Sequence, residues 1–222
     1  MENELTFALG PVEIGTSVIT TWGIMLVITL IAWLSTRHLD MLLPGKLQTT
    51  VEGIVAAIDE AITAVAPEHG RQIMPFIASL WLFLIIANML GLIPGLHSPT
   101  RDLSVTSALA TLVFFSVHWF GIKTQGWKNY LHHYLSPSPI LLPFHIISEL
   151  TRTLALAIRL FGNMMSLEMA AMLILLVAGF LAPIPVLMLH IIEALVQAYI
   201  FGMLALIYLA GAIQSQHLNS QE

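Results

Sequence analysis

Charged residues and cysteine are the scarcest components of this 222-residue chain. Only 9% of its residues are charged and 57% are hydrophobic, whereas soluble domains typically have roughly 25% charged residues. Such a chain cannot cover its surface with polar groups, which excludes a water-soluble fold. It has no cysteine, so neither a disulfide framework nor a thiolate metal site can form. The net charge of −5 is spread thinly, and no basic stripe indicates nucleic-acid binding.

Long charge-free stretches predict membrane spans. Three stretches carry no Asp, Glu, Lys or Arg, and each is long enough to cross roughly 30 Å of hydrocarbon: residues 15–36, 72–96 and 103–122. Residues 47–66 repeat apolar positions with helical spacing but include three acidic residues, which predicts an amphipathic helix at the membrane surface. The prolines within residues 124–143 favour an interfacial connection over a continuous helix.

The few cations predict the orientation, because Lys and Arg accumulate on the cytoplasmic side of short loops. The connections after the first and third spans carry most of them: Arg37, Lys46 and Arg71, then Lys123 and Lys128. The loop after the second span offers only Arg101, beside Asp102. We therefore predict that this loop and the N-terminus lie outside.

Residues 143–182 and 185–214 predict two helices that are too long to stand upright in a bilayer. An unbroken helix from Pro143 to Pro183 would run roughly 60 Å, about twice the hydrocarbon thickness. Either it tilts steeply, or Gly162 and Asn163 divide it into two spans. A break buried in lipid would leave backbone groups unpaired, which favours the tilted helix. Residues 1–222 are thus predicted to form a single integral, all-α membrane domain with about five membrane helices, an amphipathic surface helix and a steeply tilted terminal hairpin.

The first of these long helices gathers polar side chains on one face. At about 100° per residue, a sector about 100° wide holds His145, Ser148, Glu149, Arg152, Arg159, Asn163 and Ser166. Glu168 follows Arg159 by nine residues and falls on the opposite side. An arginine at mid-membrane costs at least about 2.5 kcal/mol to insert, so intramembrane charge is a functional hypothesis by default. Pairing with Glu149, about 15 Å away along the helix, cannot explain Arg159, and snorkelling suits Arg152 better.

The final helix carries a second polar stripe, because His190, Glu193 and Gln197 fall at positions i, i+3 and i+7. Histidine and glutamate in hydrocarbon are typical parts of a proton relay. A hydrogen-bonded pair that fixes helix packing is one alternative. A zinc site is another, but its third ligand is missing, so we predict neither a metal nor a cofactor.

Two runs of sequence resemble subunit a of F-type ATP synthases: RLFGNMMSLE at residues 159–168 and QAYIFGMLALIY at residues 197–208. The order of spans, amphipathic helix and terminal hairpin is similar over nearly the whole chain. The resemblance implies a stator subunit of the membrane sector Fo, without enzymatic activity of its own, in a prokaryotic inner membrane. It implies as partners a ring of c subunits, b-type peripheral stalk subunits, the remaining F1Fo subunits, the lipid bilayer and a translocated H+ or Na+.

The resemblance also implies roles for individual residues. The arginine that matches Arg159 faces the rotating c ring, in which each subunit carries a membrane-embedded carboxylate. The other matched positions are Asn163 and Gln197 near the ring, Glu168 and His190 in the periplasmic half-channel, and Arg152 at a basic position earlier on the helix. Leu167 and Glu193 depart from the pattern and leave the route of this half-channel open. The compact form resembles the N-type branch, some of whose members are thought to use sodium.

The chemistry of these residues suits the implied role. An ion from outside would pass Glu168, His190 and Glu193 and neutralise a ring carboxylate, which could then enter lipid. Arg159 would later stabilise the ionised carboxylate and release the ion inward. A self-contained secondary ion transporter or channel is the alternative, but its paired repeat is not evident. An intramembrane hydrolase could use His145 and Ser148, yet nothing beyond proximity activates the serine.

Overall fold

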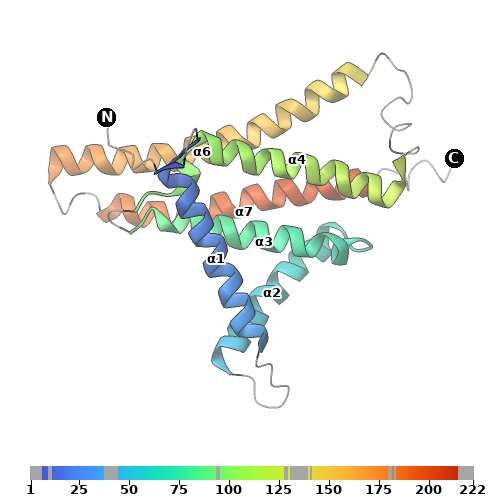
Figure 1. Cartoon of the computed structure of the whole chain (residues 1–222), viewed down its shortest axis with the longest axis horizontal. Coiled ribbons are helices and arrows are strands. Elements are labelled where there is room, and N and C mark those ends of the chain that lie inside the picture. Colours follow the sequence, from blue (N-terminus) through green and yellow to red (C-terminus); the bar gives the residue numbers. More distant parts are fainter. Residues whose placement is uncertain are drawn as a thin grey trace.

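The computed structural model describes residues 7–9, 12–37, 45–93, 96–127, 130, 140, 142–179, 182 and 184–214. Within these ranges the chain is a set of long helices: α1 (Thr16–Arg37), α2 (Lys46–Val65), α3 (Gly70–Leu90), α4 (Leu103–Gln125), α6 (Leu142–Ala178) and α7 (Ile184–Gln214) (Figure 1). Strands β1 (Phe7–Leu9) and β2 (Val12–Ile14) form a short antiparallel hairpin before α1, and the 3-10 helix η1 (Pro99–Arg101) precedes α4.

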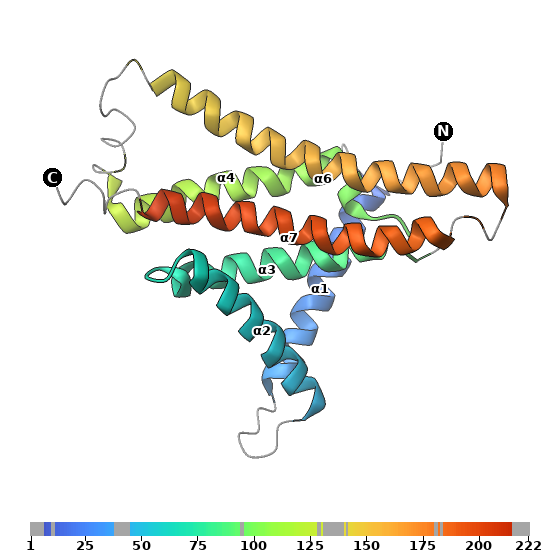
Figure 2. The same cartoon turned by 180° about the vertical axis from the view of Figure 1, so that it is seen from behind.

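Helices α3, α4, α6 and α7 form the bundle that contains the core. Helix α4 contacts both α6 and α7, and α3 contacts α7 (Figures 1 and 2). Fully buried apolar side chains from these helices include Ile77, Leu84, Leu160 and Phe201. Five helices, all except α2, are long and apolar enough to cross a membrane. The predicted all-α membrane fold is therefore confirmed.

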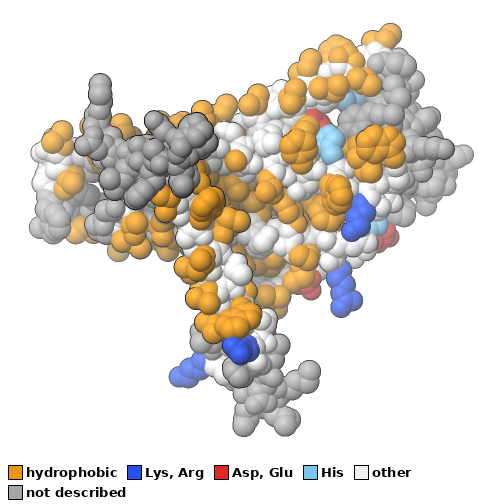
Figure 3. Space-filling model, viewed as in Figure 1, with side chains coloured by type: hydrophobic (Ala, Val, Ile, Leu, Met, Phe, Trp, Pro, Cys, Tyr) orange, Lys and Arg blue, Asp and Glu red, His pale blue; other side chains and the backbone are white. Residues whose placement is uncertain are grey.

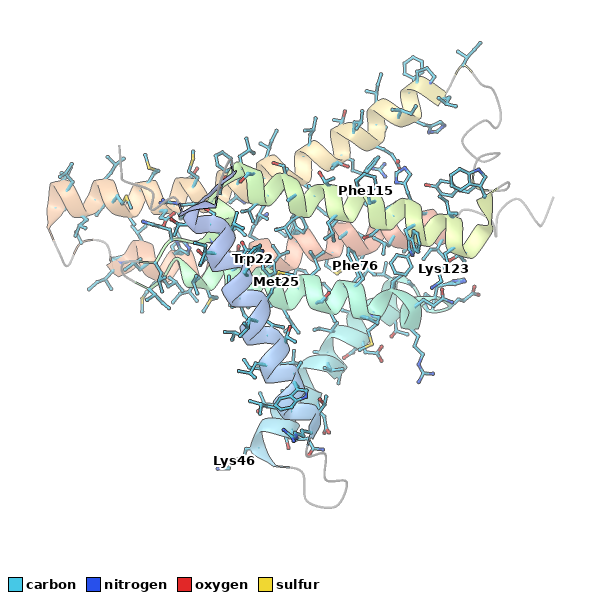
Figure 4. The ribbon with its side chains drawn as sticks, viewed as in Figure 1. Trp22, Met25, Lys46, Phe76, Phe115 and Lys123 are labelled. Atoms are coloured by element: carbon cyan, nitrogen blue, oxygen red, sulfur yellow. The ribbon has the colours of Figure 1, made fainter. Side chains whose placement is uncertain are left out.

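The outer surface of the described helices, α1 included, is largely apolar, as a lipid-facing surface must be. Orange apolar side chains cover much of the face seen in Figure 3. Trp22, Met25 and Phe115, labelled in Figure 4, are 63%, 55% and 64% exposed. So much exposed apolar surface would be unstable in water and matches the scarcity of charge in the sequence.

Helices α1 and α2 diverge from the bundle (Figure 2). Only Ile24 is buried among the 22 residues of α1. Helix α2 lies where residues 47–66 predicted an amphipathic helix, and it contacts α3 and α7.

Helix α6 is a single helix of 37 residues, about 55 Å long, with no break at Gly162 or Asn163. The alternative of two separate spans is therefore wrong. The tilt of this helix in a membrane stays a prediction. Helix α3 ends at Leu90, before the loop that was expected to begin at residue 96. Most of the predicted interfacial connection at 124–143 lies outside the described residues.

A close contact between α3 and α7 closes the middle of the bundle. The indole Nε1 of Trp81 donates a 3.4 Å hydrogen bond to the carbonyl oxygen of Tyr199, and the two rings stack with centroids 6.2 Å apart. A Cβ atom at Gly202 would lie only 1.9 Å from Trp81 Nε1. Only glycine at this position allows the indole to lie against the backbone of α7.

The start of α4 is capped by Asp102. Its Oδ1 accepts hydrogen bonds from the backbone nitrogen of Ser104 at 2.9 Å and from the Ser104 hydroxyl at 2.8 Å. Partial burial raises the pKa of this carboxyl, but the bonds from Ser104, a bond from Ser17 and the nearby charge of Arg101 together lower it by more, so the pKa of Asp102 lies below its usual value of 3.8. The cap fixes the point at which the chain enters α4 after η1.

Candidate functional site

Arg159 lies at the edge of the packed face of α6. That face is defined by four buried residues: Leu156, Ala157, Leu160 and Met164. One residue corresponds to about 100° of rotation, so Arg159 points well away from Leu160, and its side chain is exposed. Its guanidinium makes no hydrogen bond or ion pair with any residue that the structure describes. This cation is therefore directed at whatever lies beside the bundle.

One turn beyond Arg159, a polar bond joins α6 to α7. Asn163 Nδ2 donates a 2.6 Å hydrogen bond to Oε1 of Gln197, and Gln197 is only 1% exposed. The Nε2 atom of Gln197 is buried and has no acceptor among the described residues. The two amides predicted to lie near the same site are thus in direct contact, and one unsatisfied donor remains beside them.

A polar cluster around Glu168 lies where α3 ends and α4 begins, which we call the η1 end. Its Oε1 atom is 2.9 Å from Nδ1 of His97, and its Oε2 atom is 3.2 Å from Nη1 of Arg101. The Glu168 side chain is 12% exposed. The structure thus joins Glu168 to two residues that the sequence analysis left out of the ion path.

His190 is buried at the same end, with 2% of its surface exposed. A Cβ atom on Gly91 would lie 3.5 Å from His190 Nε2 and 3.3 Å from Ser98 Cβ, so the imidazole packs against the chain just after α3. Its Nε2 atom has no hydrogen-bond partner among the described residues. A buried ring nitrogen of this kind can accept or donate a proton once water or an ion reaches it.

A buried hydrogen-bond network holds this end together. The hydroxyl oxygens of Ser98 and Thr100 lie 2.6 Å apart, so one hydroxyl donates to the other. Ser98 Oγ also lies 2.8 Å from the carbonyl oxygen of Ala87, and Thr100 Oγ1 lies 2.8 Å from Asn88 Oδ1, either of which can accept the remaining hydroxyl proton. Asn88 Nδ2 donates to the carbonyl oxygen of Ala194 at 3.2 Å. The network ties α3, η1 and α7 into one unit, which fixes the backbone around His190.

The remaining predicted residues of this half stand apart from the cluster. Glu193 is partly buried and Ser166 is exposed. Neither makes a side-chain hydrogen bond or ion pair with the residues that the structure describes. No group of three His, Asp or Glu residues in the described ranges is placed to hold a metal ion.

A cavity of about 450 Å³ opens at the other end of the bundle, where α4 ends and α6 begins, which we call the Lys123 end. Four residues of the predicted polar sector line it: His145, Ser148, Glu149 and Arg152. The Arg152 guanidinium lies 4.8 Å from the centre of the Tyr208 ring, which also lines the cavity. The predicted sector therefore forms the wall of a real cavity.

Glu149 is matched by a histidine from another helix. Its Oε2 atom lies 3.0 Å from Nε2 of His118 on α4, and the side chains are 21% and 29% exposed. His118, His97 and Arg101 were not among the site residues predicted from the sequence. A lone histidine in an otherwise charge-free span is a usable signal for His118. The two loop residues carried no such signal, because a cation in a short loop usually reports orientation.

These features define a class: a multi-span membrane protein with polar clusters at both ends of an apolar bundle and an exposed arginine between them. The family model of the ATP synthase A chain matches residues 18–210. The chain is 66% identical to ATP synthase subunit a 2 of Pelobacter propionicus over 94% of its length and 91% of that protein. It is 65% identical to ATP synthase subunit a 1 of Hahella chejuensis, over 93% and 87% of the two chains. It is 55% identical to ATP synthase subunit a of Legionella pneumophila, over 97% and 94%.

The chain belongs to the ATP synthase subunit a family. Membership implies that it associates with the other subunits of an ATP synthase. The prediction made from the two sequence motifs is thereby confirmed, and the reading as a self-contained transporter is set aside.

Proposed function

We propose that this chain is the stator subunit that conducts H+ or Na+ through two half-channels and couples the flow to rotation of a c ring. The observation that carries the proposal is the exposed guanidinium of Arg159, which makes no ion pair within the described part of the chain and lies on α6 between polar clusters at the two ends of the bundle. A permanent charge in this position is costly in lipid, so it is expected to face a partner of opposite charge.

The two clusters are offset from each other along α6 and around it. Arg152, at the cavity, precedes Arg159 by seven residues, and Glu168 follows it by nine, which correspond to about 10 Å and about 14 Å of helix. Glu168 and Arg159 are about 180° apart around the axis. An ion therefore has no straight route from one cluster to the other within this chain. It would have to travel on a moving partner.

The surface around Arg159 suits a close-packed partner. Ala155 and Ser166 are exposed, and a Cβ atom built on Gly162 would meet nothing within 4 Å. Small residues let another helix approach closely in a membrane. A ring of c subunits, each with a carboxylate at the height of Arg159, would fit beside this face.

The ion path then follows in two stages. An ion from the η1 end, by way of Glu168 and His190, would neutralise a ring carboxylate, which can enter lipid only when uncharged. After a turn of the ring, the Arg159 guanidinium would attract the carboxylate and release the ion into the cavity at the Lys123 end. Each charge that crosses 100 mV releases about 2.3 kcal/mol, so several crossings are needed for each ATP.

The positions of the cations support an orientation in which the Lys123 end faces the cytoplasm of a prokaryotic cell and the N-terminus lies outside. Besides the c ring, b-type peripheral stalk subunits and the remaining F1Fo subunits would complete the complex. Catalysis of ATP synthesis or hydrolysis would reside in those partners.

The test is Arg159→Ala in the complete complex, reconstituted into vesicles. We expect ATP-driven ion pumping to be abolished while assembly stays largely intact, and vesicles stripped of the soluble sector to leak ions, because no fixed charge would separate the half-channels. Arg37→Ala is the matched control, since Arg37 ends α1 and lies 4.6 Å from the ring of Trp33, away from the proposed path. Pumping retained in Arg159→Ala would refute the proposed function.

A further inference from the structure

His118 is held on α4 in one defined orientation. Its ring centroid is 4.3 Å from that of Phe114 and 6.0 Å from that of Tyr130. Its Nδ1 atom lies 2.8 Å from the carbonyl oxygen of Phe114, and its Nε2 atom lies 3.0 Å from Oε2 of Glu149. Both nitrogens therefore face an oxygen at hydrogen-bond distance.

The hydrogen-bond geometry determines how many protons the His118–Glu149 pair contains. A carbonyl oxygen can only accept, so Nδ1 of His118 must carry the hydrogen that it shares with Phe114. A neutral imidazole has one N–H, which would leave the lone pair of Nε2 facing a carboxylate oxygen. Two acceptors do not approach to 3.0 Å unless a proton lies between them. The pair is then either imidazolium with carboxylate or imidazole with carboxylic acid, and both forms contain the same additional proton.

We propose that His118 and Glu149 share one proton and that this pair transfers protons between the cavity at the Lys123 end and the Arg159 region. The inference rests on the proposed function and deepens it, because it assigns H+ as the ion handled at this end. Glu149 lines the cavity of about 450 Å³, which is large enough for several water molecules, whereas His118 lies behind Glu149 on α4.

The transfer balances without any other reactant. A hydronium ion gives the pair a second proton, which yields imidazolium beside carboxylic acid, and becomes water. Loss of one proton to a water on the side of the Arg159 region restores the resting pair and forms hydronium there, and the reverse sequence carries a proton from that region to the cavity. A sodium ion could not replace this proton without lying next to the N–H that already points at Oε2, where the two positive groups would repel each other.

The surroundings of the pair are polar, and the described residues that line the cavity include no second carboxylate. The titratable or charged side chains among them are His145 and Arg152 from α6, Tyr130 from the chain after α4 and Tyr208 from α7. Arg152 is directed at the Tyr208 ring. Proton exchange at this end is therefore centred on Glu149.

The first variant is His118→Gln in the complete complex, assayed as ATP-driven acidification of vesicles. Glutamine can still donate a hydrogen bond to Glu149 but cannot hold an exchangeable second proton. We expect the pumping rate to fall roughly tenfold, less than the roughly 10²-fold effect of losing a direct acid–base group, because cavity water partly replaces the ring. The loss of rate in His118→Gln should become larger as the pH rises from about 6 to about 8, because Glu149 must then take its proton from a falling concentration of hydronium.

The second variant exchanges the partners, combining His118→Glu with Glu149→His. The exchanged pair again consists of one imidazole and one carboxylate around one proton. We expect its rate to recover to within about threefold of the unmodified complex, and each single change alone to stay slow. Ser116→Ala is the matched control on α4, since the Ser116 hydroxyl bonds only to the carbonyl oxygen of Leu112 in its own helix.

Several results would overturn the inference: an unchanged rate in His118→Gln, an equal loss at every pH, or ATP-driven uptake of ²²Na⁺ in place of acidification. If a single variant fails to assemble, the test rests on the pumping rate of the exchanged pair. A restored rate would support the inference, and a rate that stays low would overturn it. Loss of pumping in Arg159→Ala together with an unaffected His118→Gln would refute this inference and leave the proposed function standing.

Discussion

The two ends of the bundle stabilise a partly buried carboxylate with different sets of cationic side chains. Each end has a carboxylate on α6 matched by a group from another part of the chain. At the η1 end Glu168 lies 3.2 Å from Arg101 and 2.9 Å from His97, and at the Lys123 end Glu149 lies 3.0 Å from His118. A guanidinium keeps its charge at any physiological pH, whereas the charge of an imidazole comes and goes with a proton.

The two carboxylates are therefore stabilised in different ways. The ionised form of Glu168 lies beside the fixed charge of Arg101 and beside His97. The group at that end with an unused proton site is His190, whose Nε2 is buried without a partner among the described residues. At the Lys123 end, by contrast, the pair of His118 and Glu149 is itself the site that we propose to hold a proton.

The largest effect is expected from breaking the close contact between α3 and α7 in the middle of the bundle. Gly202→Ala would place a Cβ atom 1.9 Å from Trp81 Nε1. Overpacking of this kind typically costs about 1–3 kcal/mol, and here the clash is with a buried ring, so we expect α3 and α7 to separate and the chain to be lost from the assembled complex. Immunoblots of purified complex measure the loss.

The matched rescue is Gly202→Ala combined with Trp81→Phe, because the smaller ring frees the space that the new methyl group needs. Recovery of assembly in the double variant would assign the defect to this contact. A normal level of Gly202→Ala would show that the indole can move aside and that the middle of the bundle is looser than the geometry indicates.

A smaller effect separates the two ion pairs directly. In a double-mutant cycle, Arg101→Gln and Glu168→Gln should couple by about 2 to 3 kcal/mol, because either change alone leaves a partly buried charge unpaired. The cycle of His118→Gln and Glu149→Gln should couple by about 1 kcal/mol, since that pair can lose its charge by moving a proton. Retention of the chain in the complex under increasing dodecyl sulfate measures both. Equal couplings would erase the distinction between the ends.

The smallest effect is expected at the cap of α4, which positions the η1 end alone. Asp102→Ala should cost about 1 kcal/mol in the same detergent assay, whereas Asp102→Asn, which keeps a capping oxygen, should cost less. Because the folded-state pKa lies below 3.8, the contribution is complete at neutral pH and is lost only as the pH falls below about 3.8. A loss already apparent near pH 6 would contradict this account.

The helices were predictable because hydropathy and spacing are local properties. The undivided α6 followed from the cost of a backbone break in lipid, and the structure has no such break. The shared face of His145, Ser148, Glu149 and Arg152 also followed from the helical period, and these residues do line one cavity.

The partners of the two carboxylates could not be predicted in the same way. His97 is 71 positions from Glu168 in the sequence, and no helical period relates a loop residue to a distant helix. The bond from Asn163 to Gln197 spans 34 positions, so the sequence could give each amide a face but not its partner. Such contacts depend on how the helices cross, and the local pattern of a sequence does not contain that information.

The loose attachment of α1 has a consequence for the way this chain tolerates change. Because only Ile24 is buried, the bundle makes few contacts that depend on the shape of the other side chains on that helix. The helix then has to meet requirements of length and hydrophobicity alone, and many different apolar sequences would satisfy them equally well.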